Sequence, residues 1–444
     1  MVHWDLPFDL AQGGRELVET FEIWFLVLEF SEAPGANMKF SPSNLAGISI
    51  FLLIISGCAT YQAQKVGPTE IMRTQEEIPE DQLLDVGILV FESEEITAEE
   101  AEDEGTNNEI RRAESHFIPY HLKNTLRQSS QWGAVRVIPA ETDSVDLQVK
   151  GKILESNGEN LGLNVNVSDA AGNVWFSKNY KAEATRKTYG VNRLGEKDAF
   201  QDLYNTIAND MATFKQELSP EEIRKIRETA KLKFAAEFSP EAFGGYLESD
   251  KRDIITIKRL PADDDPMMER LLKIREREYM YVDTLNEQYD QFYNEMWPSY
   301  EDWRNLNMTE RRAMKEIKAR ALKRQLIGAL LIAGAIAAGS IDSNSIGALQ
   351  TGMILVGGQV IVSGFNISKE AEIHEAAIQE LSESFSGEMK PIVMEFEGKQ
   401  YELTGSAEEQ FKQWRELLRK IYFAETGFDP EPTPDEEQGT TKGE

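Results

Sequence analysis

The chain has 444 residues, with 47 basic and 77 acidic side chains and a formal net charge of −30. This length suggests two or three domains, and a hydrophobic fraction of 41% is sufficient to build buried cores. So negative a charge disfavours nucleic acid or an anionic lipid surface as the main partner. The single cysteine excludes an intramolecular disulfide, a cysteine-rich zinc site and an iron–sulfur cluster.

That cysteine follows a short apolar stretch near the amino terminus. Residues 47–55 are uncharged, too short for a comfortable membrane span and typical of the hydrophobic part of a secretory signal. Ile55, Ser56 and Gly57 then precede Cys58, and the segment resembles the lipobox of bacterial lipoproteins. The resemblance implies cleavage before Cys58 and a diacylglyceryl and acyl lipid on its sulfur and amine, with no other cofactor. The alternative is a buried free cysteine in an apolar helix.

The first 37 residues do not fit a secretory signal. They hold seven acids and one base, whereas the start of a signal peptide is basic. We therefore expect translation to begin at Met38, with residues 1–37 a miscalled extension and residues 38–57 the signal peptide. Amino-terminal mass spectrometry that recovered peptides from residues 1–37 would contradict this.

Cleavage at this point changes the charge of the chain. Residues 1–57 hold 2 bases and 7 acids, so the mature chain keeps 45 bases, 70 acids and a charge of −25. Ala59 follows the cysteine, where enterobacterial-type lipoproteins retained at the inner membrane carry aspartate. The resemblance thus implies an anchor in the outer membrane, with the protein on its periplasmic side. Residues 58–82 are polar and are expected to form the lipidated start and a tether.

Residues 83–218 predict an α/β domain. Alternating apolar residues predict strands, and residues 84–91 are apolar on both faces, which is typical of a buried strand. Asn157-Gly158 is a strong hairpin signal, and the acidic segment 92–108 is expected to be a solvated loop. The predicted order is strand, helix, four strands and helix, at residues 84–91, 109–129, 134–139, 145–153, 161–167, 174–184 and 196–216.

This order behind a lipidated cysteine resembles the periplasmic α/β domain of the curli secretion lipoprotein family and the amino-terminal domain of TolB-type proteins. The resemblance rests on the strand Val86–Phe91 with its following helix, on the strand Val145–Ile153 with the small Gly151, and on the hairpin pair. It covers about a third of the chain and implies a fold. The two transmembrane hairpins that the curli-type family inserts are not evident in this sequence.

Residues 219–308 predict a mainly helical region. Ser219-Pro220 and Ser239-Pro240 are typical helix starts, and residues 254–257 predict a short strand. A long helix with a stripe of aromatic residues is expected from Pro266 to Trp297. The acids at 263–265 before it are interpreted as a helix cap rather than a metal cluster.

Residues 309–366 combine a basic helix with an apolar hairpin. Residues 309–325 carry seven bases against two acids, and the segments 326–341 and 346–365 after them carry no charge. Glycine inside a water-exposed helix is unfavourable, but it lets helices approach closely. The segment resembles the glycine zippers of bacterial envelope proteins, and its candidate contact residues are Gly328, Gly334, Gly339, Gly347, Gly352 and Gly357.

Three interpretations of this hairpin stay open. In the first, the hairpin inserts in a membrane with the basic helix at the headgroups. In the second, it is buried inside a soluble domain or oligomer. In the third, several copies form a helical pore or ring. Alkaline extraction of a Cys58→Ala variant would separate them, because release into the soluble fraction would count against insertion.

The carboxy-terminal part, residues 367–425, predicts a helix, a hairpin and a second helix, followed by an acidic disordered tail over residues 426–444. We find no motif for catalysis or metal binding. His116 and His121 lie five residues apart, His374 has no second histidine near it, and each is expected to be exposed or half-buried.

The predicted fold is therefore α+β and multidomain: an α/β domain with an antiparallel meander, a mainly helical region with the Gly/Ala-rich hairpin, and a small α+β end. The predicted function is a non-enzymatic lipoprotein of a cell-envelope assembly or transport complex, held to the membrane by lipid. Expected partners are an envelope protein and further copies of the chain. The alternatives are an oligomeric export channel subunit and a periplasmic enzyme with an unrecognised site.

Overall fold

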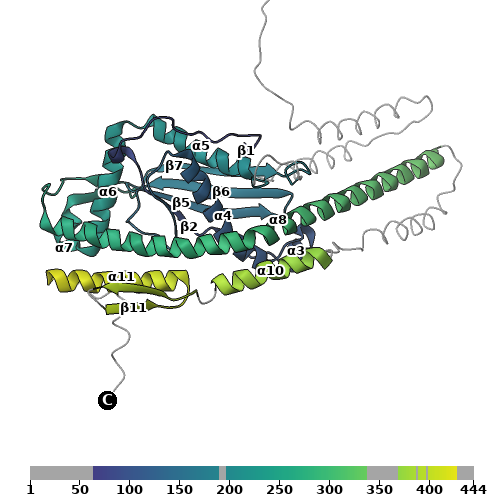
Figure 1. Ribbon diagram of the computed structural model, residues 1–444. Helices are drawn as coiled ribbons and strands as arrows, with labels where there is room; N and C mark the ends of the chain where they lie inside the picture. The colour runs from purple at the N-terminus through teal and green to yellow at the C-terminus, as the bar shows by residue number, and fades with distance from the viewer. Residues whose placement is uncertain (1–63, 190–196, 338–368, 387–388, 397–398, 428–444) are drawn as a thin grey trace, which may run out of the picture. The chain divides into compact units, whose positions relative to one another are not determined.

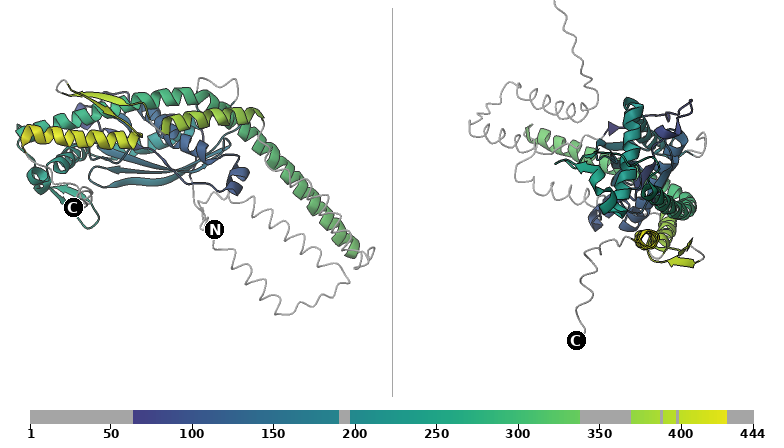
Figure 2. Two further views of the ribbon diagram at one scale, coloured as in Figure 1. Left: turned by 90° about the horizontal axis from the view of Figure 1, so that it is seen from below. Right: turned by 90° about the vertical axis from the view of Figure 1, so that its left-hand side faces the viewer.

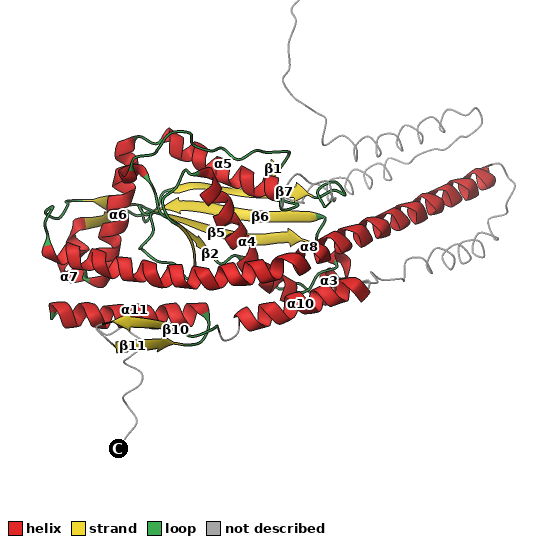
Figure 3. Ribbon diagram, viewed as in Figure 1, coloured by secondary structure: helices red, strands yellow, loops and turns green. Residues whose placement is uncertain are grey.

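The computed structural model describes residues 64–189, 197–337, 369–386, 389–396 and 399–427, and these belong to one compact unit of the chain. A mixed seven-stranded sheet lies at the centre of this described part (Figures 1 and 3). The strand order is β1-β7-β6-β5-β2-β4, with β3 beside β5. The strands are β1 Gln64–Lys65, β2 Val86–Leu89, β3 Glu92–Ser93, β4 Val135–Ile138, β5 Leu147–Ser156, β6 Asn160–Asp169 and β7 Val174–Glu183.

The sheet has a parallel and an antiparallel half. Strand β2 pairs in parallel with β4 and β5, whereas β5, β6 and β7 form an antiparallel meander. Helices α4 (Asn108–Ser129) and α5 (Gln201–Glu217) pack on one face of the sheet, where Phe117 and Leu203 join its main core (Figure 1). The predicted strand, helix, four strands and helix are all present in that sequence, with β1, β3 and helix α3 (Ala98–Glu104) as additional elements that were not predicted.

The two faces of the meander differ in polarity. The face under α4 and α5 carries buried apolar residues at every second position, as the alternation predicts. Gly151 lies on this face and leaves room for the ring of Phe91, which a Cβ would approach to 2.4 Å. The other face is polar and half-buried or exposed, with Lys150, Lys152, Asn164, Asn166, Asn179 and Lys181.

The prediction of a loop over residues 92–108 is wrong. Strand β3 and helix α3 (Ala98–Glu104) lie in this segment. Thr97 and Glu100 form a capping box at the start of α3, in which each side chain accepts a hydrogen bond from the other's backbone N–H. Because this cap satisfies two otherwise unpaired donors, it stabilises a helix that has no apolar stripe.

Part of the predicted tether lies against the body. Strand β1 pairs with β7, and a single helical turn, η3, spans Glu80–Gln82. Between them, the backbone N–H groups of Thr69 and Met72 donate to Asp202 and Asn209 of α5.

The predicted helical region also forms. Helix α6 spans Pro220–Phe238 behind a Ser219–Glu222 capping box, and α7 spans Pro240–Phe243. A short turn η4 (Gly244–Tyr246) leads into the two-stranded sheet of β8 (Leu247–Ser249) and β9 (Ile255–Ile257).

Helix α8 is far longer than predicted. It runs from Pro266 to Ala337 without a break, through Pro298, where the sequence suggested an end near Trp297. Proline inside a helix costs about 3 kcal/mol. Here Met296, Tyr300 and Trp303 on both sides of it are buried in the main core, and their burial offsets that cost.

The carboxy-terminal elements pack along α8 (Figure 2). They are helix α10 (Lys369–Ser386), the hairpin of β10 (Ile392–Phe396) and β11 (Lys399–Leu403), and helix α11 (Ala407–Thr426). Trp414 of α11 stacks near Tyr281 of α8, and both belong to a second core that also includes Val137 and Phe234. The predicted elements of this part are confirmed, while the predicted domain boundaries stay a prediction.

Candidate functional site

A group of buried polar contacts holds the middle of α8 against the α/β part. We call the five α8 residues that make them, Tyr300, Arg304, Asn307, Arg312 and Lys315, the α8 base. Arg304 donates from Nη2 to Asp198 Oδ2 at 2.6 Å, and the exposed fractions of these side chains are 1% and 0%. The Arg304 guanidinium lowers the pKa of Asp198 against the effect of burial, so this carboxyl is ionised.

Asp198 also organises the start of α5. Its Oδ1 accepts a hydrogen bond from the backbone N–H of Phe200 at 2.8 Å, directly before the helix begins. The ion pair therefore joins α5 to α8. Because removing either partner would leave the other charge buried and unpaired, the pair fixes how these helices meet.

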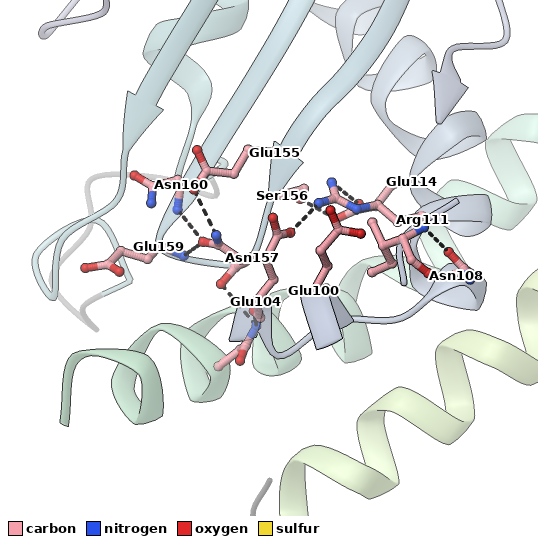
Figure 4. A network of polar contacts seen from close by, with 12 residues as sticks. Glu100, Glu104, Asn108, Arg111, Glu114, Glu155, Ser156, Asn157, Glu159 and Asn160 are labelled. Atoms are coloured by element: carbon pink, nitrogen blue, oxygen red, sulfur yellow. Dashed lines mark hydrogen bonds and ion pairs between the residues drawn. The ribbon is translucent and has the colours of Figure 1, made fainter. Parts of the chain in front are cut away.

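A second buried contact joins α8 to α4. Tyr300 donates from its hydroxyl to Glu114 Oε1 at 2.6 Å, and Ser156 at the end of β5 donates to the same oxygen. Burial raises the pKa of Glu114, although Arg111 opposes the shift. Arg111 lies between Glu104, at 2.7 Å, and Glu114, at 3.7 Å (Figure 4).

The β5–β6 hairpin supplies the third contact. Asn157 Oδ1 accepts from the backbone N–H of Asn160 at 2.9 Å and holds the tip closed (Figure 4). Gly158 has a φ of +72°, and a Cβ there would lie 2.2 Å from the carbonyl oxygen of Arg304. Asn307 donates from Nδ2 to the carbonyl of Asn157 at 3.1 Å. The predicted Asn157-Gly158 turn is therefore a contact surface for α8 as well as a turn.

Glu159 of the same hairpin binds the last two residues of the α8 base, Arg312 and Lys315. Its two carboxylate oxygens accept hydrogen bonds from Arg312 Nε at 3.1 Å and from Lys315 Nζ at 2.6 Å. Arg312 also donates to the carbonyl of Ala184 after β7 at 2.7 Å. Two bases of the predicted basic helix are thus used to hold α8 in place.

Beyond the α8 base, the helix leaves the body. We call residues 316–337 of α8 the basic arm; 22 residues of helix span roughly 33 Å. The arm projects away from the other described elements in two perpendicular views (Figures 1 and 2). Ile317 is 44% exposed and Leu322 58% exposed. Lys318, Arg320 and Lys323 are exposed on the same segment.

The predicted anchor lies outside the described residues. This holds for Ile55, Ser56, Gly57 and Cys58, and also for Gly339, Gly347, Gly352 and Gly357 of the hairpin. Gly328 and Gly334 lie on the backbone of the basic arm. Within the described ranges, no helix is long and apolar enough to span a membrane.

The histidine prediction is wrong for His121. Its side chain is buried under α8, with Nδ1 2.7 Å from the Tyr293 hydroxyl and Nε2 3.0 Å from Gln201 Oε1. Gln201 Oε1 is an acceptor, so we assign the proton to Nε2. Burial lowers the pKa of His121, which agrees with a neutral ring. In the part of the chain that the structure describes, no group of three or more metal-ligating side chains could hold an ion.

The sequence interpretation missed most of the α8 base. Asp198 and Arg304 are 106 residues apart, and no local pattern links two such residues. A signal did exist for α3, because Thr97 and Glu100 have the spacing of a capping box. Asn157-Gly158 was found as a turn, but its contact with α8 depends on tertiary structure.

Comparisons with known proteins add little. No protein-family model matches the chain, and no curated protein matches it. Among solved structures, the chain is similar to protein XCC0632 from Xanthomonas campestris, described as DUF330. The likeness covers 35% of this chain and 98% of that one, at 10% identity and a TM-score of 0.20. A likeness at this TM-score carries no argument about fold or function.

Proposed function

We propose that the chain is a non-enzymatic lipoprotein of the bacterial envelope, tethered by lipid at Cys58, which holds the basic arm at an anionic membrane surface as part of an envelope assembly. The observation that carries the proposal is the path of α8. A buried ion pair at Arg304 and a partly exposed one at Lys315 hold it against the body, and beyond them the helix leaves the body with exposed bases at Lys318, Arg320 and Lys323.

The sequence of the arm suits a membrane surface. The described part of the arm carries three exposed basic residues, Lys318, Arg320 and Lys323, although the chain as a whole is acidic. The sequence from Leu326 onward is uncharged for sixteen residues. Basic residues beside an apolar segment are attracted to anionic headgroups, by about 1 kcal/mol for each Lys or Arg. The charge of −25 on the expected mature chain repels such a surface, so the arm is the place where contact is favourable.

Binding to vesicles tests the proposal. Residues 62–444 form a compact unit with its own core and can be used without the signal region. We expect this fragment to bind vesicles that contain phosphatidylglycerol more tightly than vesicles of phosphatidylcholine alone. Replacing Arg320 and Lys323 by glutamine should weaken the binding to anionic vesicles about 30-fold, since it removes about 2 kcal/mol.

The matched control replaces two exposed bases elsewhere on the body. Lys251 and Arg252 lie in the turn between β8 and β9, and their replacement by glutamine changes the net charge by the same amount. This variant should bind within about twofold of the wild type. If both variants lose affinity equally, or neither loses it, the arm does not contact the membrane and the proposal fails.

A further inference from the structure

A pocket beside helix α4 contains a buried lysine that has no salt-bridge partner among the described residues. The pocket has a volume of about 520 Å³ and lies between α4, β4 and α8. Lys123 of α4 lines it and is 5% exposed. Its Nζ lies 4.2 Å from the centre of the Tyr120 ring. Among the described residues, no carboxylate or carbonyl accepts a hydrogen bond from this ammonium group.

The acids around the pocket are used elsewhere. Asp283 binds Arg136 through both oxygens, at 2.6 and 3.0 Å. Asp290 accepts a hydrogen bond from the Tyr120 hydroxyl at 2.6 Å. Glu287 is exposed at the rim, as is Arg127. Burial, and after it the positive charge of Arg127, lowers the pKa of Lys123 to about 8. The negative charges of Asp290 and Asp283 raise the pKa and oppose this shift only in part. The buried charge is thus poorly neutralised by the protein itself.

The sheet edge supplies a second donor to the same pocket. Strand β4 is the last strand of the sheet and pairs only with β2. Every second residue of β4 therefore points its backbone N–H and C=O away from β2, toward the open edge of the sheet. At Val137 these groups are paired with the side-chain amide of Asn286, at 3.0 and 2.8 Å. Val135, two residues earlier, has the same orientation and lines the pocket. Within the described part, nothing accepts a hydrogen bond from its backbone N–H.

We propose that this pocket binds an oxyanion, the carboxylate or phosphate group of a small organic ligand, through the Lys123 ammonium and the Val135 N–H. The Lys123 side chain is 5% exposed and its Nζ has no hydrogen-bond acceptor among the described residues, so an acceptor in the pocket would complete both this ammonium group and the Val135 N–H. A carboxylate or phosphate supplies several acceptor oxygens and the missing negative charge. The volume lies in the range of small-molecule pockets, and Arg127 at the rim attracts the anion.

Competitive labelling of lysines tests this on the intact protein, with Lys215 as internal control. Lys215 is equally buried and its pKa is also lowered to about 8, but its Nζ donates to the carbonyl of Gln131 at 2.5 Å. We expect phenyl phosphate or benzoate to slow trace acetylation of Lys123 at least tenfold at pH 8, because a bound anion holds the proton on Nζ. Lys215 should react as before, and potassium chloride at equal ionic strength should protect neither lysine.

The two ligands separate the two sources of the anion. Protection by phenyl phosphate alone assigns a phosphate site, and protection by benzoate alone assigns a carboxylate site. Lys123→Met should abolish binding of the protecting ligand in calorimetry, while Lys215→Met retains it. If neither ligand changes the labelling of Lys123, or if Lys123 and Lys215 are protected to the same degree, the proposal is wrong; this readout does not require either variant to fold.

Discussion

At the scale of single residues, the structure depends on charges that are buried in pairs. Arg304 and Asp198 are almost completely excluded from water, as are Arg111 and Glu114. Such pairs seldom add much stability compared with apolar residues, but they fix geometry because breaking them is costly. In this protein the Arg304–Asp198 pair fixes where α8 meets the start of α5, and Glu114 of α4 accepts a hydrogen bond from Tyr300 of α8.

Replacing Arg304 by methionine should be strongly destabilising. It leaves Asp198 buried without a counter-charge, and such losses cost about 3–5 kcal/mol in free energy of unfolding. Urea denaturation measures this cost. The double variant Arg304→Met/Asp198→Asn should recover part of the loss, since no charge is left unpaired. The exposed pair Arg320–Glu316 is the control, because Arg320→Met should change stability by at most about 1 kcal/mol.

His121 should make stability depend on pH. Its pKa in the folded protein is lowered by burial, so the unfolded chain binds its proton more readily. The contribution of His121 is therefore fully present above about pH 6.5, the ordinary value for histidine, and is lost as the pH falls toward the folded value. The difference in unfolding free energy between wild type and His121→Gln should shrink from pH 7.5 to pH 5. A difference that stays constant or grows would show that the ring does not titrate in this way.

At the scale of elements, the sequence predicted what depends on local pattern. The strands of the meander follow from alternation, α6 follows from Ser219-Pro220 at its start, and α11 follows from its apolar stripe. The continuity of α8 through Pro298 could not be predicted, because the compensating burial of Tyr300 and Trp303 comes from distant elements. Of the candidate site, only the Asn157-Gly158 turn was visible, since the rest consists of long-range pairs.

Gly158 in the β5–β6 turn should let α8 pack closely against the turn, because glycine has no side chain. Gly158→Ala introduces a left-handed alanine, at a cost of about 1–2 kcal/mol, and also a clash with the Arg304 carbonyl. Gly427→Ala is the matched control, because Gly427 has a φ of +76° and nothing within 4 Å of an added Cβ. Thermal unfolding should show a clearly larger loss for Gly158→Ala. Equal losses would mean that the close approach to α8 contributes nothing.

At the scale of the whole molecule, we propose that the protein is held at a membrane from two places. One is the lipid predicted at Cys58, and the other is the basic arm of α8. The α/β sheet, with α4, α5 and the first part of α8 packed around a shared core, is the body from which the arm extends. The proposal that the chain is a lipid-anchored envelope protein depends on a lipid at Cys58, which one measurement can detect.

Mass spectrometry of the protein isolated from bacterial membranes tests this claim most directly. Trypsin cleaves after Lys65, so a processed lipoprotein yields a first peptide, Cys58–Lys65, that carries the mass of a diacylglyceryl group. We expect this acylated peptide and no peptide from residues 1–57. Recovery of an unmodified peptide spanning residues 40–65, which joins the signal region to the body, would contradict it.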